Sequence, residues 1–422
     1  MKPQFSLLHL FAACLFTITA QAENWPGWRG TLGTGKAEGK NFPTTWSRDK
    51  NVRWRIDLPE RGNSSPVVWG DRVFVTQAIE AKGGRQLLCF HREDGRLLWQ
   101  KSIEFGTKEL THRTNPYCSA SPVTDGKHVI VSHASAGVFC YDLEGKELWR
   151  RNLGVQEHIW GNAASPVIYQ NLCFLNFGPG KRTFLIALNL KDGKTVWQHD
   201  EAGGDSGIAE KGQRGKWVGS WTTPILIDGK RGDELLMSFP NRVVAFDPLK
   251  GKEIWSCRGL NPLVYTSPIY ENGIIVVMGG YRGTAMGVRT GGVGDVTATH
   301  QLWTRPREKQ RIGSGVLVGG HVYILNEDGV AQCIEARQGK VVWEERLRGA
   351  GGNGKSWSSM VVADGKLYAI NQSGDAFVLR AAPKFELLAT NALGEMTQSS
   401  MAFAGGDIFV RTYKSLWCIS GK

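Results

Sequence analysis

The 422-residue chain repeats one pattern of residues eight times. Each copy begins with a serine or threonine, usually before a proline, and the eight steps are Ser65-Pro66, Ser121-Pro122, Ser165-Pro166, Thr223-Pro224, Ser267-Pro268, Ser314-Gly315, Ser359-Met360 and Ser400-Met401. Two short apolar segments joined by a turn follow each step, and a third and a fourth segment complete the copy. Such a repeat lets a chain grow past the roughly 250 to 300 residues of a single hydrophobic core.

A tryptophan marks the fourth segment of successive copies. These residues are Trp54, Trp99, Trp149, Trp197, Trp255, Trp303 and Trp343, on average about 48 residues apart, with Leu388 in the corresponding place of the remaining copy. Four short strands in a unit of this length are typical of a β-propeller blade. We therefore predict an all-β fold, an eight-bladed β-propeller with four-stranded antiparallel blades and a structural tryptophan ladder.

The two ends of the repeat region complement each other. The last copy stops after three strands, of which the third is residues 416–419, whereas residues 51–57 form a fourth strand with Trp54 and no preceding partners. Pairing the two closes the ring and removes the exposed edges. We predict one propeller domain over residues 51–422, preceded by an extension, residues 23–50, whose three tryptophans favour packing on the propeller.

The first 22 residues have the composition of a signal peptide. Lys2 precedes an apolar run that ends at Ala20-Gln21-Ala22, so we predict cleavage after Ala22 and a periplasmic or secreted protein. No later stretch approaches the length of a membrane-spanning helix. The residues around Cys14 loosely match a lipoprotein signal, so an outer-membrane lipoprotein acylated at Cys14 is the alternative.

The charge of the chain narrows the choice of partner. Removal of residues 1–22 deletes one lysine and no acidic residue, which changes the net charge from +12 to +11. A basic exported protein attracts polyanions, so we expect a protein or an anionic envelope component as partner. We expect no nucleic acid, because the chain has no recognition motif and no basic helix. We expect a monomer.

Seven cysteines follow the signal peptide. Four of them, Cys89, Cys140, Cys333 and Cys418, occupy the third-strand position held by alanine in other copies. Equivalent positions on different blades should lie farther apart than the ~7 Å that a disulfide tolerates between Cα atoms. We therefore predict that these four are buried structural residues. For Cys118, Cys173 and Cys257 the repeat gives no such position, and we predict no disulfide among them.

One repeat carries a motif with a family resemblance. The spacing of Ala245, Asp247, Gly251, Lys252 and Trp255 resembles the tryptophan-docking repeat of propellers of the pyrroloquinoline quinone (PQQ) type, and residues 24–30 are similar to the start of many exported bacterial members. The resemblance covers residues 24–420 and implies the propeller fold. The family contains quinoprotein dehydrogenases and also non-enzymatic docking platforms of the BamB type.

The chain departs from the enzymes of that family. Quinoprotein alcohol dehydrogenases carry a vicinal cysteine pair beside the cofactor, and no two cysteines are adjacent here; a Cys-x-x-Cys-His haem motif is also missing. We therefore predict a non-catalytic binding or scaffold platform for an envelope macromolecule, without a cofactor. A PQQ-dependent dehydrogenase with calcium is the alternative, and a glycan-binding propeller is a weaker one.

The long connections should gather on one face of the propeller, where binding residues concentrate. The residues predicted to surround the channel mouth on this face are Asn63, His112, Tyr117, His158, Trp160, Asn162, Trp217, Trp221, Tyr265, Arg311, Trp357 and Gln398. Aromatic, amide and guanidinium groups of this kind bind planar, sugar-like or peptide ligands. The competing interpretation is that the aromatic residues plug the channel. We predict no catalytic residue and no metal ligand.

Two further features have a simpler interpretation. Basic residues cluster at Lys211, Arg214 and Lys216 and again over 305–311, where they either receive an anionic partner or form a solvated surface. Residues 349–356 satisfy the phosphate-loop pattern, which requires a helix directly after the loop. Because the sequence predicts a strand there, we reject nucleotide binding.

Overall fold

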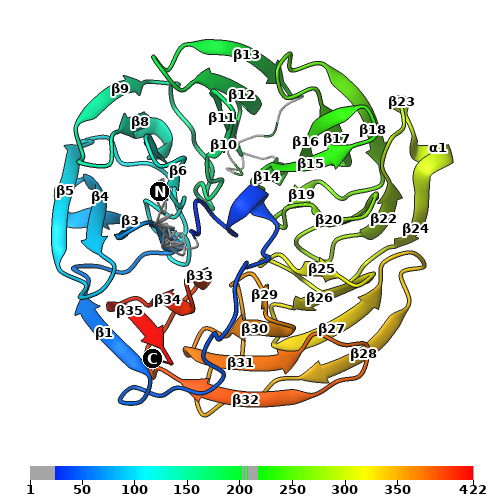
Figure 1. Ribbon diagram of the computed structural model, residues 1–422. Helices are drawn as coiled ribbons and strands as arrows, with labels where there is room; N and C mark the ends of the chain where they lie inside the picture. Colours follow the sequence, from blue (N-terminus) through cyan, green and yellow to red (C-terminus); the bar gives the residue numbers. More distant parts are fainter. Residues whose placement is uncertain (1–23, 202–203, 205–206, 208–216, 422) are drawn as a thin grey trace, which may run out of the picture.

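In the computed structural model, eight four-stranded units are arranged around a common centre (Figure 1). The structure describes residues 24–201, 204, 207 and 217–421. The predicted signal peptide with Cys14 and the basic residues Lys211, Arg214 and Lys216 lie outside the described residues. The predicted fold, an eight-bladed propeller with antiparallel blades, is confirmed.

The blades follow one another along the chain, each with its first strand innermost. Blades 1 to 4 consist of β2 (Val67–Trp69), β3 (Arg72–Ile79), β4 (Gly84–His91) and β5 (Leu97–Glu104); β6 (Val123–Thr124), β7 (Val129–Ser132), β8 (Val138–Tyr141) and β9 (Glu147–Arg151); β10 (Val167–Tyr169), β11 (Leu172–Phe177), β12 (Phe184–Asn189) and β13 (Thr195–Asp200); and β15 (Ile225–Gly229), β16 (Gly232–Phe239), β17 (Arg242–Phe246) and β18 (Glu253–Arg258).

Blades 5 to 8 complete the circle. They consist of β20 (Ile269–Glu271), β21 (Ile274–Met278), β22 (Ala285–Arg289) and β24 (Gln301–Arg305); β25 (Val316–Val318), β26 (His321–Leu325), β27 (Val330–Glu335) and β28 (Val341–Arg346); β29 (Val361–Ala363), β30 (Lys366–Ile370), β31 (Asp375–Arg380) and β32 (Leu387–Ala392); and β33 (Ala402–Ala404), β34 (Asp407–Arg411), β35 (Ser415–Ser420) and β1 (Val52–Asp57).

A few short elements lie outside this plan. They are the helical turns η1 (Thr31–Gly33), η2 (Glu80–Lys82), η3 (Ala134–Ala136) and α1 (Thr297–His300), the parallel pair β14 (Gly219–Ser220) and β19 (Leu263–Val264), and β23 (Gly294–Asp295), which extends blade 4 beside β18. None of the described helices has the length and apolar character needed to cross a membrane.

The last blade is closed by the first strand of the chain, as the sequence predicts. Strand β1 pairs antiparallel with β35, with Ile56 opposite Leu416 and Val52 opposite Ile419. The eighth blade therefore joins residues about 360 positions apart, and the outer edge of β35 is covered rather than exposed.

The ladder tryptophans connect neighbouring blades. Within its own blade each faces a small residue, as Trp149 faces Cys140 and Trp197 faces Ala187. Its indole nitrogen then reaches the next blade: Trp149 Nε1 donates to the Leu190 carbonyl at 2.7 Å. Trp255 is the exception, because its Nε1 donates to Glu234 within the same blade at 2.9 Å. One-residue bulges next to these pairs fix their register.

The prediction for the seventh blade is wrong by one residue. In β32 it is Ala389 that lies opposite Val378, just after the bulge, in the place that tryptophan takes elsewhere. Leu388 is the residue that the bulge leaves out of the pairing. In the other blades the tryptophan marks the residue that follows the bulge. The seventh blade has no tryptophan, so the sequence alone could not show which residue of β32 takes that place.

The serine and threonine steps form a closed ring, which we call the hydroxyl ring. In each blade the backbone N–H of the step residue donates to the side-chain oxygen of the next one, at 2.8 to 3.0 Å, through Ser65, Ser121, Ser165, Thr223, Ser267, Ser314, Ser359, Ser400 and back to Ser65. Every ring residue lies two positions before its innermost strand. The ring satisfies eight buried amides and ties the blades together at the channel.

The segment before β1 crosses the centre of the propeller, as the dark blue trace shows (Figure 1). Trp25 N–H donates to the Val68 carbonyl at 2.8 Å, Thr124 N–H donates to the Pro26 carbonyl at 2.8 Å, and Ala37 N–H donates to the Val362 carbonyl at 2.9 Å. Trp25 and Trp46 are buried. The extension thus packs on blades 1, 2 and 7 and closes one end of the channel.

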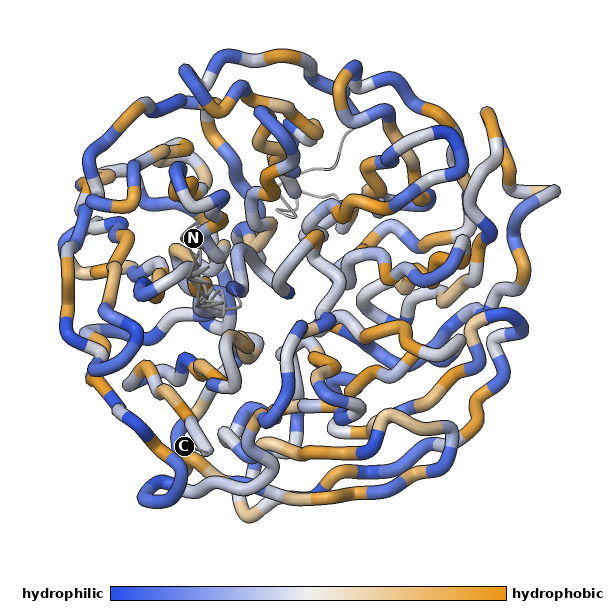
Figure 2. Tube along the Cα trace, viewed as in Figure 1, coloured by the Kyte–Doolittle hydropathy of each residue, from blue (hydrophilic) through white to orange (hydrophobic). Residues whose placement is uncertain are grey.

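The core lies between the blades. Hydrophobic and hydrophilic residues alternate along the outer strands (Figure 2), so that one side of each outer strand packs inward. The seven cysteines of the described part, Cys89, Cys118, Cys140, Cys173, Cys257, Cys333 and Cys418, are all buried and free. Four of them face a ladder tryptophan directly, which explains why a small side chain is needed there.

Candidate functional site

A cavity of about 390 Å³ occupies the centre of the hydroxyl ring, and we call it the cup. The predicted mouth residues, such as Asn63, come just before the ring residues in the sequence. The extension instead pairs with Val68, which comes three positions after the ring residue Ser65. The extension therefore lies on the far side of the ring from the mouth. Trp28, the one residue of the extension that lines the cup, provides its floor.

The cup wall combines aromatic, amide and hydroxyl side chains. Its lining residues are Trp28, Asn63, Ser65, His112, Thr114, Asn115, Ser119, Ser121, Trp160, Ala163, Ser165, Trp221, Thr223, Tyr265, Tyr281, Gln310, Ile312, Trp357, Ser359, Gln398 and Ser400. Although 21% of the chain is charged, this lining contains no Asp, Glu, Lys or Arg among the described residues. The described lining of the cup therefore consists of polar and aromatic groups, with His112 as its one titratable residue besides tyrosine.

The aromatic residues of one wall hold each other in place. The ring centroids of Trp221 and Tyr265 lie 5.2 Å apart, those of Trp160 and Trp221 lie 5.8 Å apart, and Trp221 Nε1 donates to the Gly161 carbonyl at 2.8 Å. The Trp221–Tyr265 pair is edge-to-face, a geometry that is favourable beyond the area it buries. Burial raises the pKa of Tyr265, which keeps its hydroxyl neutral. The wall is thus prearranged and leaves the cup open.

Several polar atoms of the cup have no protein partner among the described residues. Asn63 Oδ1 and Trp357 Nε1 are unpaired, but both atoms have almost no accessible surface and do not face the open cavity. The hydroxyl ring residues accept an N–H each, and their own O–H groups donate to none of the described atoms. Buried polar groups are nearly always hydrogen-bonded, so these hydroxyls need water or a ligand.

The structure brings seven of the twelve predicted mouth residues together in the cup wall: Asn63, His112, Trp160, Trp221, Tyr265, Trp357 and Gln398. Trp217 lies outside the cup, 51% exposed, with its ring 5.4 Å from that of Trp160. His158 is buried behind the wall, where its ring meets that of Trp221 edge-on at 4.9 Å.

The remaining three predicted residues do not reach the mouth. Tyr117 and Asn162 line a separate cavity of about 30 Å³. Arg311 is fully buried and donates to Glu308 at 3.1 Å and to Gln332 at 2.8 Å. The placement of Arg311 at the mouth is corrected by this finding: its guanidinium is turned into the blade because the Glu308 carboxylate and the Gln332 amide oxygen accept its hydrogen bonds there.

The second basic cluster is neutralised by its neighbours. Lys309 Nζ lies 2.8 Å from Glu344 Oε1, and Arg305 Nε lies 2.5 Å from Glu308 Oε1. Arg307 is exposed. Since Glu308 within the segment and the more distant Glu344 supply counter-charges, we interpret this segment as a solvated, paired surface and not as a receptor for an anion.

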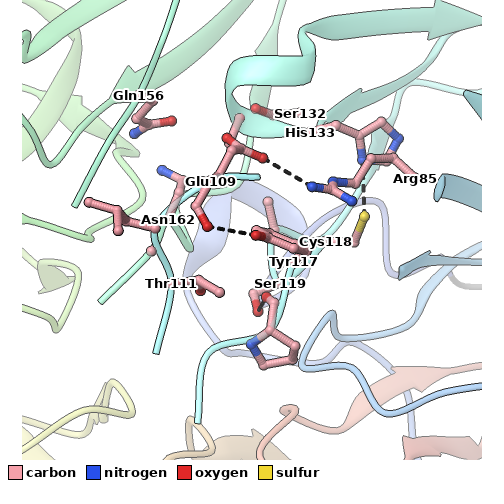
Figure 3. A pocket seen from close by; sticks show the side chains of 15 residues that line it. Arg85, Glu109, Thr111, Tyr117, Cys118, Ser119, Ser132, His133, Gln156 and Asn162 are labelled. Carbon is pink, nitrogen blue, oxygen red and sulfur yellow. Dashed lines mark hydrogen bonds and ion pairs between the residues drawn. The ribbon is translucent and has the colours of Figure 1, made fainter. Parts of the chain in front are cut away.

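A second cluster lies beside the smaller cavity and includes residues that the sequence did not single out together (Figure 3). Cys118 Sγ lies 3.4 Å from His133 Nδ1, and Arg85 pairs with Glu109 at 3.2 Å. The Arg85 guanidinium lies over the Tyr117 ring at 3.8 Å. Cys118 has a positive φ of 58°, which is uncommon for a residue other than glycine.

This cysteine and histidine pair resembles a nucleophile with its base, but its electrostatics oppose that role. Burial raises the pKa of Cys118 to about 12 and, together with the charge of Arg85, lowers the pKa of His133 to about 3. Both groups are neutral at pH 7, whereas a reactive cysteine needs the thiolate. A cavity of about 30 Å³ also leaves no room for a substrate.

Other chemistry is not indicated within the described residues. No group of three or more His, Cys, Asp or Glu side chains there could hold a metal ion. The phosphate-loop pattern at residues 349–356 leads into β29, not into a helix. Its Gly351 N–H donates to Asp375 Oδ2 at 3.0 Å, so a carboxylate already takes the place of a phosphate oxygen.

Sequence reasoning missed two components of the cup. The hydroxyl ring was visible as eight Ser/Thr steps, but only the circular arrangement shows that each hydroxyl accepts from the neighbouring blade. Trp28 was visible as an aromatic residue of the extension, but its position at the channel floor depends on the path of the chain across the centre.

Fold and site together define a class of protein: a closed propeller with tryptophan-docked blades and an uncharged cup at the channel mouth. The chain belongs to the family described as outer membrane protein assembly factor BamB, whose model matches residues 43–153, 86–345 and 229–422.

Individual relatives agree with this family. An outer membrane protein assembly factor BamB from Kangiella koreensis is 27% identical over 174 residues, which are 39% of this chain and 38% of that protein. The match therefore spans less than half of that relative.

Solved structures share the fold at low identity. BamB from Moraxella catarrhalis superposes with a TM-score of 0.62 at 13% identity, covering 87% of this chain and 96% of that one. A europium-containing methanol dehydrogenase superposes with a TM-score of 0.66 at 11% identity, covering 93% and 90%. Because enzymes and an assembly factor are equally similar, the fold does not decide the activity.

Proposed function

We propose that the protein is an exported, non-catalytic scaffold in outer membrane protein assembly and that it binds a partner protein through the face on which the cup opens. The family match over residues 43–422 supports the assembly role. The partner-binding role rests on the exposed aromatic residues beside the cup. A location in the periplasm, as predicted from the signal peptide, is part of the same proposal.

The observation that carries the proposal is the exposure of Trp217. This side chain is 51% exposed and packs against Trp160 at the mouth, and Tyr281, at the cup wall, is 50% exposed. Tryptophan and tyrosine are enriched among the residues that dominate protein interfaces. Large aromatic side chains left in water at a preformed mouth are therefore candidates for contact with a partner.

The dehydrogenase alternative is not supported by the chemistry of the cup. PQQ carries three carboxylates, and calcium prefers several carboxylate or carbonyl oxygens. The cup lining has no Lys or Arg to receive the carboxylates and no Asp or Glu to bind calcium, among the described residues. We therefore propose that the protein functions without this cofactor.

Replacement of Trp217 tests the proposal. Tagged wild-type protein, Trp217→Ala and Val342→Ala are expressed in the source cells, crosslinked and purified under denaturing conditions. Val342 is a matched control, because it is 40% exposed on the outer strand β28, far from the mouth. We expect a discrete outer-membrane assembly protein to crosslink to the wild type and to Val342→Ala, and to be lost from Trp217→Ala. Equal crosslinking of all three, or of none, would contradict the proposal.

A further inference from the structure

We propose that the cup is a binding site for a neutral carbohydrate, such as the end of an uncharged glycan. This inference rests on the proposed function only in that both place binding on the same face. It concerns different residues: the platform uses the exposed Trp217, whereas the carbohydrate site lies inside the hydroxyl ring.

The first argument is the absence of charge in the cup. No charged side chain lines it among the described residues. The cation next to the floor, Arg29, is 1% exposed and donates to the carbonyls of Thr34 and Gly315, beneath Trp28. A carboxylate or phosphate placed in the cup would lose hydration without a direct hydrogen bond to a charged side chain of the described lining, which is costly. The cup therefore favours a neutral ligand.

The second argument is the set of unused hydrogen-bonding groups. Six ring hydroxyls, those of Ser65, Ser121, Ser165, Thr223, Ser359 and Ser400, line the cup with their O–H donors free among the described atoms. Gln310 and Gln398, which line the same cavity, add amide groups that can donate and accept. A purely apolar ligand would leave these groups unsatisfied, whereas each hydroxyl of a sugar both donates and accepts.

The third argument is the aromatic surface on both sides of this polar ring, at the floor and at the wall of the cup. Trp28, Trp160, Trp221, Tyr265, Tyr281 and Trp357 surround the same cavity. Sugar rings combine an apolar C–H face with an edge of hydroxyls, so they match a site that pairs aromatic faces with amides and hydroxyls. The volume of about 390 Å³ lies at the small end of the usual range of roughly 300 to 1,000 Å³ for ligand sites. A mono- or disaccharide unit fits this class better than an extended peptide, because the cup is closed by Trp28.

The inference is tested by titrating the purified mature protein with glucose, N-acetylglucosamine, maltose and cellobiose, followed by tryptophan fluorescence and by calorimetry. Glucuronate serves as the matched charged probe, because it differs from glucose by a carboxylate. We expect saturable binding of at least one neutral sugar and binding of glucuronate at least about tenfold weaker than that of glucose. Absence of saturation by every neutral sugar at millimolar concentration, or equal binding of glucuronate, would overturn the inference.

Two variants separate the cup from the platform. Trp357→Leu removes an aromatic ring from the cup wall, so we expect sugar affinity to fall about tenfold while partner crosslinking is retained. Trp217→Ala should retain the sugar and lose the partner. If Trp357→Leu, shown to be folded by its thermal transition, binds sugar as tightly as the wild type, the cup assignment is wrong. The cup assignment would also be contradicted if Trp217→Ala lost sugar binding while the Trp357 variant kept it.

Discussion

The backbone N–H of Ser400 donates to the side-chain oxygen of Ser65 at 2.9 Å, across 335 residues of sequence. This bond is the closing link of the hydroxyl ring, and the pairing of β1 with β35 is the matching closure at the outer edge. The propeller is thus closed twice, once at the channel and once at the rim. The inner closure also positions the hydroxyls that face the cup.

Removing the closing hydroxyl should destabilise the whole ring. In Ser65→Ala the buried N–H of Ser400 loses its acceptor, so we expect the free energy of unfolding to fall by about 1 to 3 kcal/mol. Urea denaturation followed by circular dichroism measures this change. Ser65→Thr is the control, because Thr223 occupies an equivalent position in the ring. Equal stability of Ser65→Ala and the wild type would contradict a structural role of the ring.

The tryptophan ladder requires glycine in the hairpins that it contacts. Gly193 has a φ of 68°, and a Cβ there would lie 2.6 Å from the Trp149 ring. Gly365 has a similar φ of 70° but open space around it. We expect Gly365→Ala to cost about 1 to 2 kcal/mol from its backbone conformation alone, and Gly193→Ala to cost roughly 1 to 3 kcal/mol more from overpacking. Equal losses of stability in thermal unfolding would show that the tryptophan contact is not tight.

His133 should make stability depend on pH. Burial holds its pKa at about 3 in the folded state, whereas an unfolded histidine titrates near about 6.5. Unfolding therefore takes up a proton between these values, so the stabilisation is complete above about pH 6.5 and is lost progressively as the pH falls. In urea denaturation from pH 7 to pH 5, we expect a shallower decline for His133→Asn than for the wild type. Parallel declines would mean that the imidazole is charged in the folded protein.

The buried thiols should be unreactive in the native protein. Burial raises the pKa of Cys118, Cys89 and Cys173 to about 12. Because the thiolate is the reacting species, we expect iodoacetamide at pH 8 to label none of the seven described cysteines before urea is added and all of them afterwards. Labelling is read by mass spectrometry. Rapid native labelling of Cys118 would instead indicate an activated pair with His133.

The architecture could be predicted from the sequence because it depends on local, repeated signals. The spacing of the tryptophans and the unpaired strand around Trp54 were sufficient for the blade number and for the closure, both of which are confirmed. The register at Leu388 was not predictable, since it depends on a bulge that only strand pairing shows.

The site could be predicted only in part. Residues placed by the backbone just before an inner strand, such as Trp357 and Gln398, do line the cup. Arg311 does not line the cup, because its long side chain can turn away from the backbone position and donate hydrogen bonds to Glu308 and Gln332 inside the blade. The proximity of Cys118 and His133 likewise results from packing between neighbouring segments and left no signal in the spacing.

The central claim, that the channel mouth binds without catalysing a redox reaction, is tested most directly by equilibrium dialysis of the purified protein against PQQ with calcium. The same samples are assayed for dye-linked oxidation of simple alcohols. The uncharged cup predicts no stoichiometric uptake and no turnover. Retention of one PQQ per chain together with alcohol oxidation would contradict the account and assign the protein to the dehydrogenases.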